Sequence, residues 1–428
     1  MRSTHTVVIG AGQAGLAVSH LLGRRGVDHV VLDRGRTGES WRSRRWDSLR
    51  LLTPNWMTRL PGAEYDGPDP AGFMAAAEVA GFLSNYARSS GAPVVEAAEV
   101  VAVRSLGDGY LVASTAGTWT ARAVVIATGA CQHTSVPQVA AGLHRSLVQV
   151  TPDVYRRPEE LPDGGVLVVG ASASGAQLAD ELASSGRDVV LAVGGHTRLP
   201  RRYRGLDSIW WLDQLGAFER HVDDLLDPAA ALREPSLQLA GRSDGQDVDL
   251  PSLHDKGVRL AGRLVGARGS VVTLAADLAE TTAAADHRLY RLLARIDGHI
   301  ARSGLETEVL PRGRLRPVPR PADAPTRLDL RAERVRTVLW ATGYKRSYPW
   351  LRVPVLDPRG ELMHRHGITP APGLYVVGLR WQTRRSSTFI DGVGHDARLV
   401  VDHLTRTRGG AAADVASSEE DRCAPRGT

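Results

Sequence analysis

Residues 6–22 are TVVIGAGQAGLAVSHLL, and this stretch decides the fold. β-Branched residues at 6–9 predict a strand, Gly10–Gly15 predict a tight turn, and the apolar spacing after them predicts a helix. A second strand is expected at His29–Leu32, and Asp33 ends it. In such a unit, unpaired N–H groups at the start of the helix face the turn and can bind a pyrophosphate. The sequence therefore predicts a dinucleotide-binding domain at the start of the chain.

The same pattern recurs in the middle of the chain. Val166–Val169 predict a buried strand, Gly170–Gly175 are GASASG, and a helical pattern and the strand Asp188–Val193 follow. Two further strands, Ala123–Ile126 and Val335–Trp340, each run into Ala-Thr-Gly, so that the backbone can pass close to a bulky group. Two such units predict an α/β fold with two Rossmann-like dinucleotide-binding domains.

The repeated segments also predict the domain boundaries. The first domain is expected to be discontinuous, with the second domain inserted into it and carrying a largely helical insertion. The expected ranges are 1–157 for the first domain, 158–324 for the second domain with its insertion at about 195–312, 325–406 for the return of the first domain, and 407–428 for a disordered tail. The tail is small, charged and proline-containing, and it has too little apolar surface to pack.

Composition excludes several classes of protein. The 428 residues carry a net charge of +6, but acidic residues are scattered among the basic ones, which argues against a nucleic-acid partner. No apolar run reaches the roughly 18 residues of a membrane helix, so no membrane association is expected. Cys131 and Cys423 form neither a disulfide framework nor a CxxC pair, which fits a reducing cytoplasm. No metal is expected either, because His364 and His366 lack the spacing of a metal motif.

The two glycine-rich turns differ in the residues that follow them. Asp33 can accept hydrogen bonds from a ribose, which predicts FAD at the first turn. Arginines follow the second unit, and guanidinium groups match a ribose 2′-phosphate, which predicts NADPH there. The candidate residues are Gly10, Gly12, Gln13, Ala14, Gly15 and Asp33 for FAD, and Gly170, Ser172, Ser174, Gly175, Arg198, Arg201 and Arg202 for NADPH. The alternatives are that Gly15 only packs the helix on the sheet and that the arginines form a solvated loop.

Further segments, taken together with the glycine-rich turns, resemble a known family. They are Gly38–Arg42 (GESWR), Arg45–Leu51 (RWDSLRL), Thr53-Pro54 and Phe389–Gly394 (FIDGVG). The combination resembles the flavin-containing monooxygenases of the small bacterial kind, which are related to N-hydroxylating and Baeyer–Villiger monooxygenases. The resemblance implies FAD-binding roles for Arg34, Ser40, Trp41, Arg42, Thr53, Ala127, Thr128, Gly129, Thr342, Gly343 and Asp391. It also places residues 46–56 beside the isoalloxazine, with Asn55 as the candidate catalytic residue.

The resemblance implies an NADPH-dependent monooxygenase. Hydride passes to the flavin, a C4a-hydroperoxide forms with O₂, and one oxygen atom goes to a small substrate, at nitrogen or sulfur. Thr151-Pro152 replace a family His-Ser pair, which argues against a Baeyer–Villiger reaction, and Leu52 replaces a family asparagine. These departures leave open a flavin reductase that passes electrons to an acceptor, or a non-catalytic flavin-bearing sensor. The expected partners are the small substrate and O₂, in a cytoplasmic monomer or homodimer.

Overall fold

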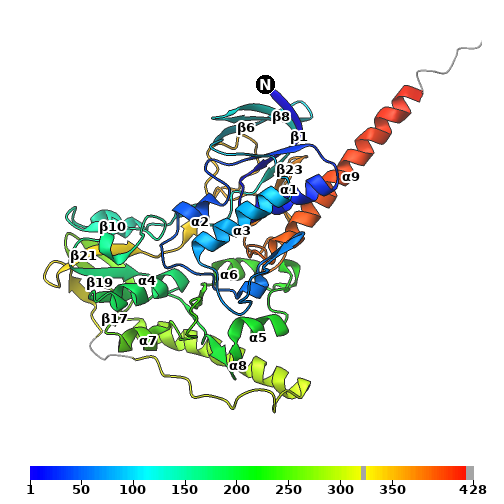
Figure 1. Ribbon diagram of the computed structural model, residues 1–428. Helices are drawn as coiled ribbons and strands as arrows, with labels where there is room; N and C mark the ends of the chain where they lie inside the picture. Colours follow the sequence, from blue (N-terminus) through cyan, green and yellow to red (C-terminus); the bar gives the residue numbers. More distant parts are fainter. Residues whose placement is uncertain (320–323, 421–428) are drawn as a thin grey trace, which may run out of the picture.

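Two sheets, each built on one of the glycine-rich turns, form the body of the computed structural model, which describes residues 1–319 and 324–420 (Figure 1). The first sheet has the strand order β5-β2-β1-β8-β7-β6, and β23 also pairs with β8. The bounds are β1 Arg2–Ile9, β2 His29–Leu32, β5 Val94–Val95, β6 Val100–Leu106, β7 Gly109–Ser114, β8 Gly117–Ile126 and β23 Leu374–Val376. The strands β5, β2, β1, β8 and β23 pair in parallel, whereas β6 and β7 extend the sheet as an antiparallel meander.

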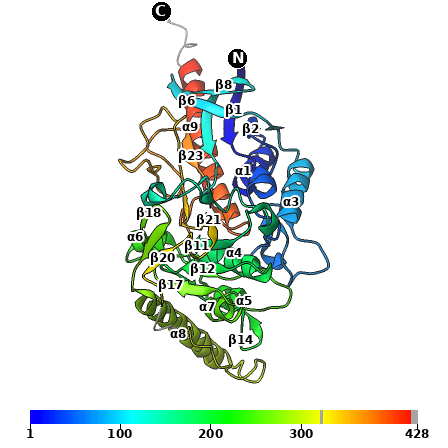
Figure 2. The ribbon, with the colours of Figure 1, turned by 90° about the vertical axis from the view of Figure 1, so that its left-hand side faces the viewer.

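Helices α1 (Gln13–Arg24), α3 (Ala76–Ser89) and α9 (Val393–Glu420) cover one face of the first sheet. Their apolar side chains, such as Leu16, Leu83 and Val400, pack against Val8 and Val125 of the central strands. These contacts bring the two ends of the described chain into one core. Figure 2 shows α9 running alongside β23 and α1, far from α8 at the opposite end of the molecule.

The second sheet is parallel throughout and has the order β10-β21-β11-β12-β17. Its strands are β10 Val148–Val150, β11 Gly165–Val169, β12 Val189–Ala192, β17 Arg259–Ala261 and β21 Val335–Trp340. Helices α4 (Ala173–Ser184) and α7 (Leu250–Asp255) pack on one face, together with Trp46 and Tyr155. The other face is covered by η2 (Gln138–Gly142) and by the antiparallel strands β18 (Leu264–Arg268), β19 (Val271–Leu274) and β20 (Arg327–Asp329).

The segment after β12 and the helix α8 (Leu278–Ser303), which follows β19, share a hydrophobic core of their own. Trp211 of α5 (Ser208–Gln214) and Leu289 and Ile296 of α8 are fully or almost fully buried in it. The remaining short elements are α2 Glu39–Ser43, α6 Pro228–Arg233, η1 Asn55–Met57, η3 Pro158–Glu160, η4 Val222–Asp224, β3 Arg59–Leu60, β4 Ala63–Glu64, β9 His133–Thr134, β13 Thr197–Arg198, β14 Arg202–Tyr203, β15 Leu206–Asp207, β16 Leu237–Gln238 and β22 Tyr344–Lys345.

The structure moves three of the expected domain boundaries. β10 and β21 belong to the second sheet, so the second unit begins before residue 157 and extends beyond residue 324. β21 is the counterpart of β8, because Trp340 lies beside Val169 as Ile126 lies beside Ile9. The insertion expected at 195–312 also contributes β17 to the second sheet. Pairing with distant strands fixes these segments, and their short local patterns do not reveal it.

The expected disordered tail is also revised, because α9 continues to Glu420. The run of alanines at 411–413 favours helix, and no proline occurs between Pro372 and Pro425. Residues 421–428 lie outside the described part of the chain. Among the helices of that part, none is both long enough and apolar enough to cross a membrane.

Candidate cofactor sites

A cavity of about 1110 Å³ opens at the carboxyl ends of β1, β2 and β8. Ligand sites typically measure roughly 300–1,000 Å³, so this cavity has room for a large cofactor. Its lining includes Gly10, Gly12, Gln13, Ala14, Asp33, Arg34, Ser40, Trp41, Ala127, Thr128 and Gly129, all predicted from the sequence. The carboxyl ends of parallel strands are where open α/β sheets bind their ligands.

The glycines of the first turn have different roles. A Cβ atom on Gly10 would lie 2.6 Å from the carbonyl oxygen of Ala127, and Gly10 has a φ of +109°. A Cβ atom on Gly15 would lie 1.8 Å from the carbonyl oxygen of Gly10. Around Gly12, in contrast, no atom of the described residues lies within 4 Å of the Cβ position. Gly10 and Gly15 are therefore required by backbone packing, whereas Gly12 keeps the backbone accessible from the cavity, which fits a bound pyrophosphate.

Asp33 fixes the shape of the first turn while it faces the cavity. Its two carboxylate oxygens accept hydrogen bonds from the backbone N–H groups of Ala11, at 2.6 Å, and Gly35, at 2.8 Å. Burial raises the pKa of this carboxyl group, and the two backbone donors oppose the shift. A carboxylate oxygen can accept more than one hydrogen bond, so Asp33 can still accept from ribose hydroxyls.

The positive charge of the cavity comes from Arg34, which was predicted, and from three arginines that were not, whereas the predicted Arg42 lies outside the lining. Arg34, Arg36, Arg44 and Arg45 line the cavity. The guanidinium group of Arg42 instead donates to the carbonyl oxygen of Thr37 and to Ser84 on α3, so this side chain fastens α2 to α3. Arg44 donates to the carbonyl oxygen of Gln132 and to Asp153, which connects the cavity wall to the segment that precedes β11.

Asn55 lies outside the cavity lining and is 4% exposed. Its side-chain amide donates to the carbonyl oxygen of Asp69 at 2.9 Å, and its side-chain oxygen accepts from the backbone N–H of Met74 at 2.7 Å. Both ends of the side chain thus hold the loop 69–74. The geometry gives Asn55 a structural task, in contrast to the catalytic role expected for it. Trp46, at the start of the same stretch, is buried among side chains of the second domain.

The remaining residues implied by the resemblance also make contacts outside the cavity lining. Asp391 forms a two-bond ion pair with Arg59, at 2.6 and 2.8 Å. Thr342 donates to the carbonyl oxygen of Ser135, and the carbonyl oxygen of Gly343 accepts from the backbone N–H of Ser135. The Thr342-Gly343 turn therefore joins the end of β21 to the segment after β8. Thr53 is partly buried outside the lining.

The second glycine-rich turn reproduces the first one in detail. A Cβ atom on Gly175 would lie 1.8 Å from the carbonyl oxygen of Gly170, and Gly170 packs on Ala341 as Gly10 packs on Ala127. Ser172 stands where Gly12 stands in the first turn, and Val193 stands where Asp33 stands. Since Val193 is fully buried and apolar, the second site has no carboxylate for a ribose at this position. Ser174 is partly exposed on the first turn of α4.

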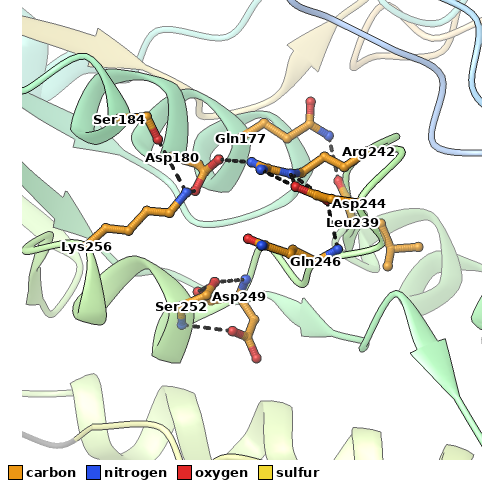
Figure 3. A network of polar contacts seen from close by, with 10 residues as sticks. All are labelled: Gln177, Asp180, Ser184, Leu239, Arg242, Asp244, Gln246, Asp249, Ser252 and Lys256. Carbon is orange, nitrogen blue, oxygen red and sulfur yellow. Dashed lines mark hydrogen bonds and ion pairs between the residues drawn. The ribbon is translucent and has the colours of Figure 1, made fainter.

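The segment 237–256 braces the second turn through polar side chains (Figure 3). Gln238 donates to the carbonyl oxygen of Ala171 at 2.6 Å, and so replaces the bond that Gly38 makes to Ala11 in the first domain. Figure 3 shows Arg242 and Lys256 converging on Asp180 of α4, and Gln177 donates to the carbonyl oxygen of Leu239. These contacts fasten the segment to α4 and to the turn before it, and so fix the position of the N-terminus of α4.

The arginines predicted to bind a 2′-phosphate are placed differently from that expectation. Arg198 is 3% exposed and forms ion pairs with Asp249 at 2.9 Å and Asp286 at 3.0 Å. Arg201 is 1% exposed, donates to the carbonyl oxygen of Leu52 and pairs with Asp207. Arg202 is exposed. Carboxylates therefore occupy the guanidinium groups of Arg198 and Arg201, which corrects the expectation for these two side chains.

The cavity also contains residues that sequence reasoning missed. Glu96 follows β5, a two-residue strand with too short a pattern to be recognised, and Val100 begins β6. Thr388 lies in the loop before α9, where its carbonyl oxygen accepts from the side chain of Gln13, and Val393 begins α9. The pairing of β5 with β2 could have indicated Glu96, because residues that follow neighbouring parallel strands meet at one edge of the sheet.

Comparison with known proteins gives relatives that span almost the whole chain. A family model described as pyridine nucleotide-disulphide oxidoreductase matches residues 7–209. A CzcO-like oxidoreductase of Geobacillus kaustophilus is 31% identical over 402 residues, which cover 93% of this chain and 97% of the relative. The indole-3-pyruvate monooxygenase YUCCA4 of Oryza sativa is 31% identical over 230 residues, which cover 48% of this chain and 52% of that protein.

Solved structures confirm the α/β flavoprotein fold with parallel sheets. A flavin-containing monooxygenase of Stenotrophomonas maltophilia matches with a TM-score of 0.65 and 20% identity, over 95% of this chain and 99% of that one. A bacillithiol disulfide reductase of Bacillus cereus matches with a TM-score of 0.60 and 13% identity, over 95% and 100%. At these identities the likeness establishes the fold. The resemblance predicted from the sequence motifs is confirmed.

Proposed function

The chain belongs to the CzcO-like oxidoreductases of the pyridine nucleotide-disulphide oxidoreductase family, and from this premise we propose that it is an NADPH-dependent flavoprotein monooxygenase. The observation that carries the proposal is the pair of matching glycine-rich turns, one of them opening on a large cavity. One turn serves a resident flavin and the other a nicotinamide donor. The flavin-dependent character is also supported by the monooxygenases among the relatives and matching structures.

The residues of the first site suit FAD. The backbone around Gly12 and the N-terminus of α1 would bind the pyrophosphate, and Asp33 would accept from the adenosine ribose. Arg44 and Arg45 supply positive charge, and Trp41 contributes an aromatic wall. When bound, FAD supplies hydride acceptance from NADPH and activation of O₂ for transfer of one oxygen atom. The chain's task is to orient the cofactor and to keep water from the reacting edge.

The proposed substrate is a small molecule with a nucleophilic nitrogen or sulfur, and O₂ is the co-substrate. A thiol–disulfide reaction is not supported, because the chain has two cysteines, Cys131 and Cys423, without a CxxC pair. A second candidate is a flavin reductase that passes electrons to an acceptor. It is favoured by Asn55, because backbone groups occupy both ends of its side-chain amide and it offers no polar group to the flavin.

Product analysis under ¹⁸O₂ tests the proposal. Flavin-loaded protein and NADPH are incubated with a panel of amines and sulfides, and mass spectrometry follows incorporation of one ¹⁸O atom. NADPH consumption and peroxide release are measured in the same samples. Incorporation with peroxide well below the NADPH consumed supports monooxygenation. NADPH consumption matched by peroxide release or by reduction of an added quinone, with no labelled product, supports the reductase.

A further inference from the structure

His221, Asp223 and His366 meet where the segment after α5 contacts the chain that leads to β23. Nε2 of His366 lies 3.0 Å from the carboxylate of Asp223, and Nδ1 of His221 lies 3.5 Å from the same carboxylate. The ligand atoms of the three side chains all lie within 4.8 Å of one another. The centroids of the two imidazole rings are 5.2 Å apart, and the rings are inclined by 75°.

The two separations to Asp223 match the edges of a tetrahedron around a metal ion, and the imidazole nitrogens lie within 4.8 Å of one another. Zinc–nitrogen and zinc–oxygen bonds of about 2.0–2.2 Å place neighbouring ligand atoms roughly 3.3–3.5 Å apart. The two measured separations, 3.0 and 3.5 Å, lie around that value. Two imidazoles and one carboxylate are a common ligand set for zinc, and a fourth position would be left for water. Asp223 is half exposed, so water can reach the site.

Backbone contacts hold the three ligands in place from segments far apart in the sequence. The backbone N–H of Val222 donates to the carbonyl oxygen of Thr383 at 2.7 Å, and the backbone N–H of Arg385 donates to the carbonyl oxygen of Arg220 at 3.1 Å. His366 has a φ of +52°, a conformation that side chains other than glycine, asparagine and aspartate rarely adopt. The turn closed by the bridge between Arg365 and Ile368 thus fixes the backbone at His366, whose Nε2 lies 3.2 Å from Asp223 Oδ1.

The local charge permits a cation at this point. Asp223 supplies one negative charge to the site. The two histidines offer ring nitrogens as ligands and add no negative charge. Of the basic neighbours, Arg384 is already paired with Glu219, whereas Arg365, next to His366 in the chain, also acts on Asp223. A metal would replace two contacts between the ligands, the hydrogen bond of His366 Nε2 with Asp223 at 3.2 Å and the donation from the backbone N–H of Asp223 to Nδ1 of His221 at 3.2 Å. Both contacts are solvent-exposed, so water can take over the donor that is left.

We propose that His221, Asp223 and His366 bind a divalent transition-metal ion of the zinc type. The ion would fasten the segment 219–225 to the hairpin around His366. The same segment pairs with residues 383–386, just before Thr388 in the wall of the cofactor cavity. The inference does not depend on the proposed function, since it concerns three side chains outside the cofactor cavity. Sequence spacing could not indicate this site, because the ligands come from two distant segments.

Metal titration of the flavin-loaded, tag-free full chain tests the inference. Isothermal titration with ZnCl₂ gives stoichiometry and affinity, and titration with CoCl₂ reports geometry through the visible absorption of tetrahedral cobalt. The variants are His221→Ala, Asp223→Asn and His366→Asn, the last chosen because asparagine tolerates the positive φ. The matched control is His287→Ala, an exposed histidine on α8. Flavin content and circular dichroism show whether each variant is folded.

We expect one zinc ion per chain and a tetrahedral cobalt spectrum for the parent and for the control. Each ligand variant should weaken zinc binding at least about tenfold, since loss of even an outer partner of a metal site costs 10- to 100-fold. Absence of the tetrahedral spectrum in the parent overturns the inference. So does parental zinc affinity in the Asp223→Asn variant, whose exposed substitution leaves the core intact.

Discussion

The carbonyl oxygen of Gly10 lies 1.8 Å from the position that a Cβ atom on Gly15 would occupy. The same 1.8 Å separates the carbonyl oxygen of Gly170 from a Cβ position on Gly175. In each unit the first turn of the helix is therefore pressed against the end of the strand. The third glycine of the motif is fixed by this packing, whether or not a nucleotide binds. Gly12 differs, since no described atom lies within 4 Å of its Cβ position.

This difference predicts opposite outcomes for two substitutions in one motif. Gly12→Val should leave the fold intact, because its φ of −85° and ψ of −173° suit any residue, but it should lower FAD affinity at least about tenfold, about 1.4 kcal/mol. Gly15→Ala should destabilise the fold by about 1–3 kcal/mol or more, because its methyl group meets backbone. Flavin absorbance after gel filtration measures the first effect, and urea unfolding of the apoprotein measures the second.

Stoichiometric flavin in the purified Gly12→Val protein would contradict the assignment of FAD to this turn. Gly23→Ala, on the same helix and also without a described atom within 4 Å of its Cβ position, is the control for both measurements. It should keep its flavin and its stability.

The local pattern was sufficient to predict both nucleotide units. The strand at His29–Leu32 has the bounds expected from the sequence, whereas the helix begins at Gln13, inside the stretch Gly10–Gly15 expected to form the turn. Both predictions depend on a glycine-rich turn between β-branched and helical segments, and such a signal is contained within about 30 residues. The cavity lining that these segments supply was predictable for the same reason. Segments whose place depends on a distant strand, such as β21 and β10, could not be assigned from local pattern.

The partners of charged side chains could not be predicted either. Arg198 follows the second nucleotide unit as a phosphate-binding arginine would, but Asp249 and Asp286 reach it from other segments. Nothing in the sequence near Arg198 indicates these carboxylates. A similar limit applies to Asn55, because its partners in the loop 69–74 become neighbours only when the chain folds back. Sequence reasoning found polar residues of the right kind, and the fold decided what they bind.

Arg198→Ala should therefore affect stability more than coenzyme choice. Removing one partner of a buried ion pair leaves Asp249, 5% exposed, without its counter-charge, at a cost of about 3–5 kcal/mol. The exposed Arg202→Ala should change stability by about 0.5 kcal/mol or less. Urea unfolding of both variants measures this. An Arg198→Ala protein of parental stability that discriminates poorly between NADPH and NADH would restore the phosphate-binding interpretation.

Arg263 is a better candidate for contact with a 2′-phosphate. Gly194 follows Val193 at the end of the second unit, and the side chain of Arg263 lies 3.7 Å from the Cβ position of Gly194. Its guanidinium group is exposed and pairs with Asp277. Arg263→Ala should weaken binding of 2′,5′-ADP about tenfold, about 1.4 kcal/mol, while binding of 5′-AMP stays unchanged. Isothermal titration measures both, and exposed Arg268→Ala is the control; equal losses for the two ligands would exclude the phosphate contact.

Asn55→Ala should lower the stability of the protein and leave its rate of NADPH oxidation nearly unchanged. The substitution removes both bonds to the loop 69–74 and leaves the N–H of Met74 without its partner, at a cost of about 1–3 kcal/mol. Because Asn55 lies outside the cavity lining, the rate of NADPH oxidation per bound flavin should stay within about twofold of the parent. A rate loss of tenfold or more per bound flavin, at parental stability, would return Asn55 to a catalytic role.

Asp396 on α9 should make stability decrease with rising pH. It is fully buried, Thr383 donates to one of its oxygens, and burial raises its pKa from 3.8 to about 6, with Arg384 and His366 opposing the shift. The folded state thus binds a proton that the unfolded state releases, so this contribution is fully present below pH 3.8 and is lost as pH rises through about 6. The loss amounts to about 3 kcal/mol at 1.36 kcal/mol per pKa unit.

The variant Asp396→Asn has no proton to lose at this position. Its free energy of unfolding, relative to that of the parent, should therefore increase by about 2 kcal/mol between pH 4.5 and pH 7.5, because part of the contribution is already lost at pH 4.5. Urea unfolding at saturating FAD at the two pH values measures the change, and the comparison with the parent cancels the other titrating groups. Asp402→Asn, a half-exposed carboxylate on the same helix, is the control. A stability difference that is the same at both pH values would show that Asp396 is ionised in the folded protein throughout this range.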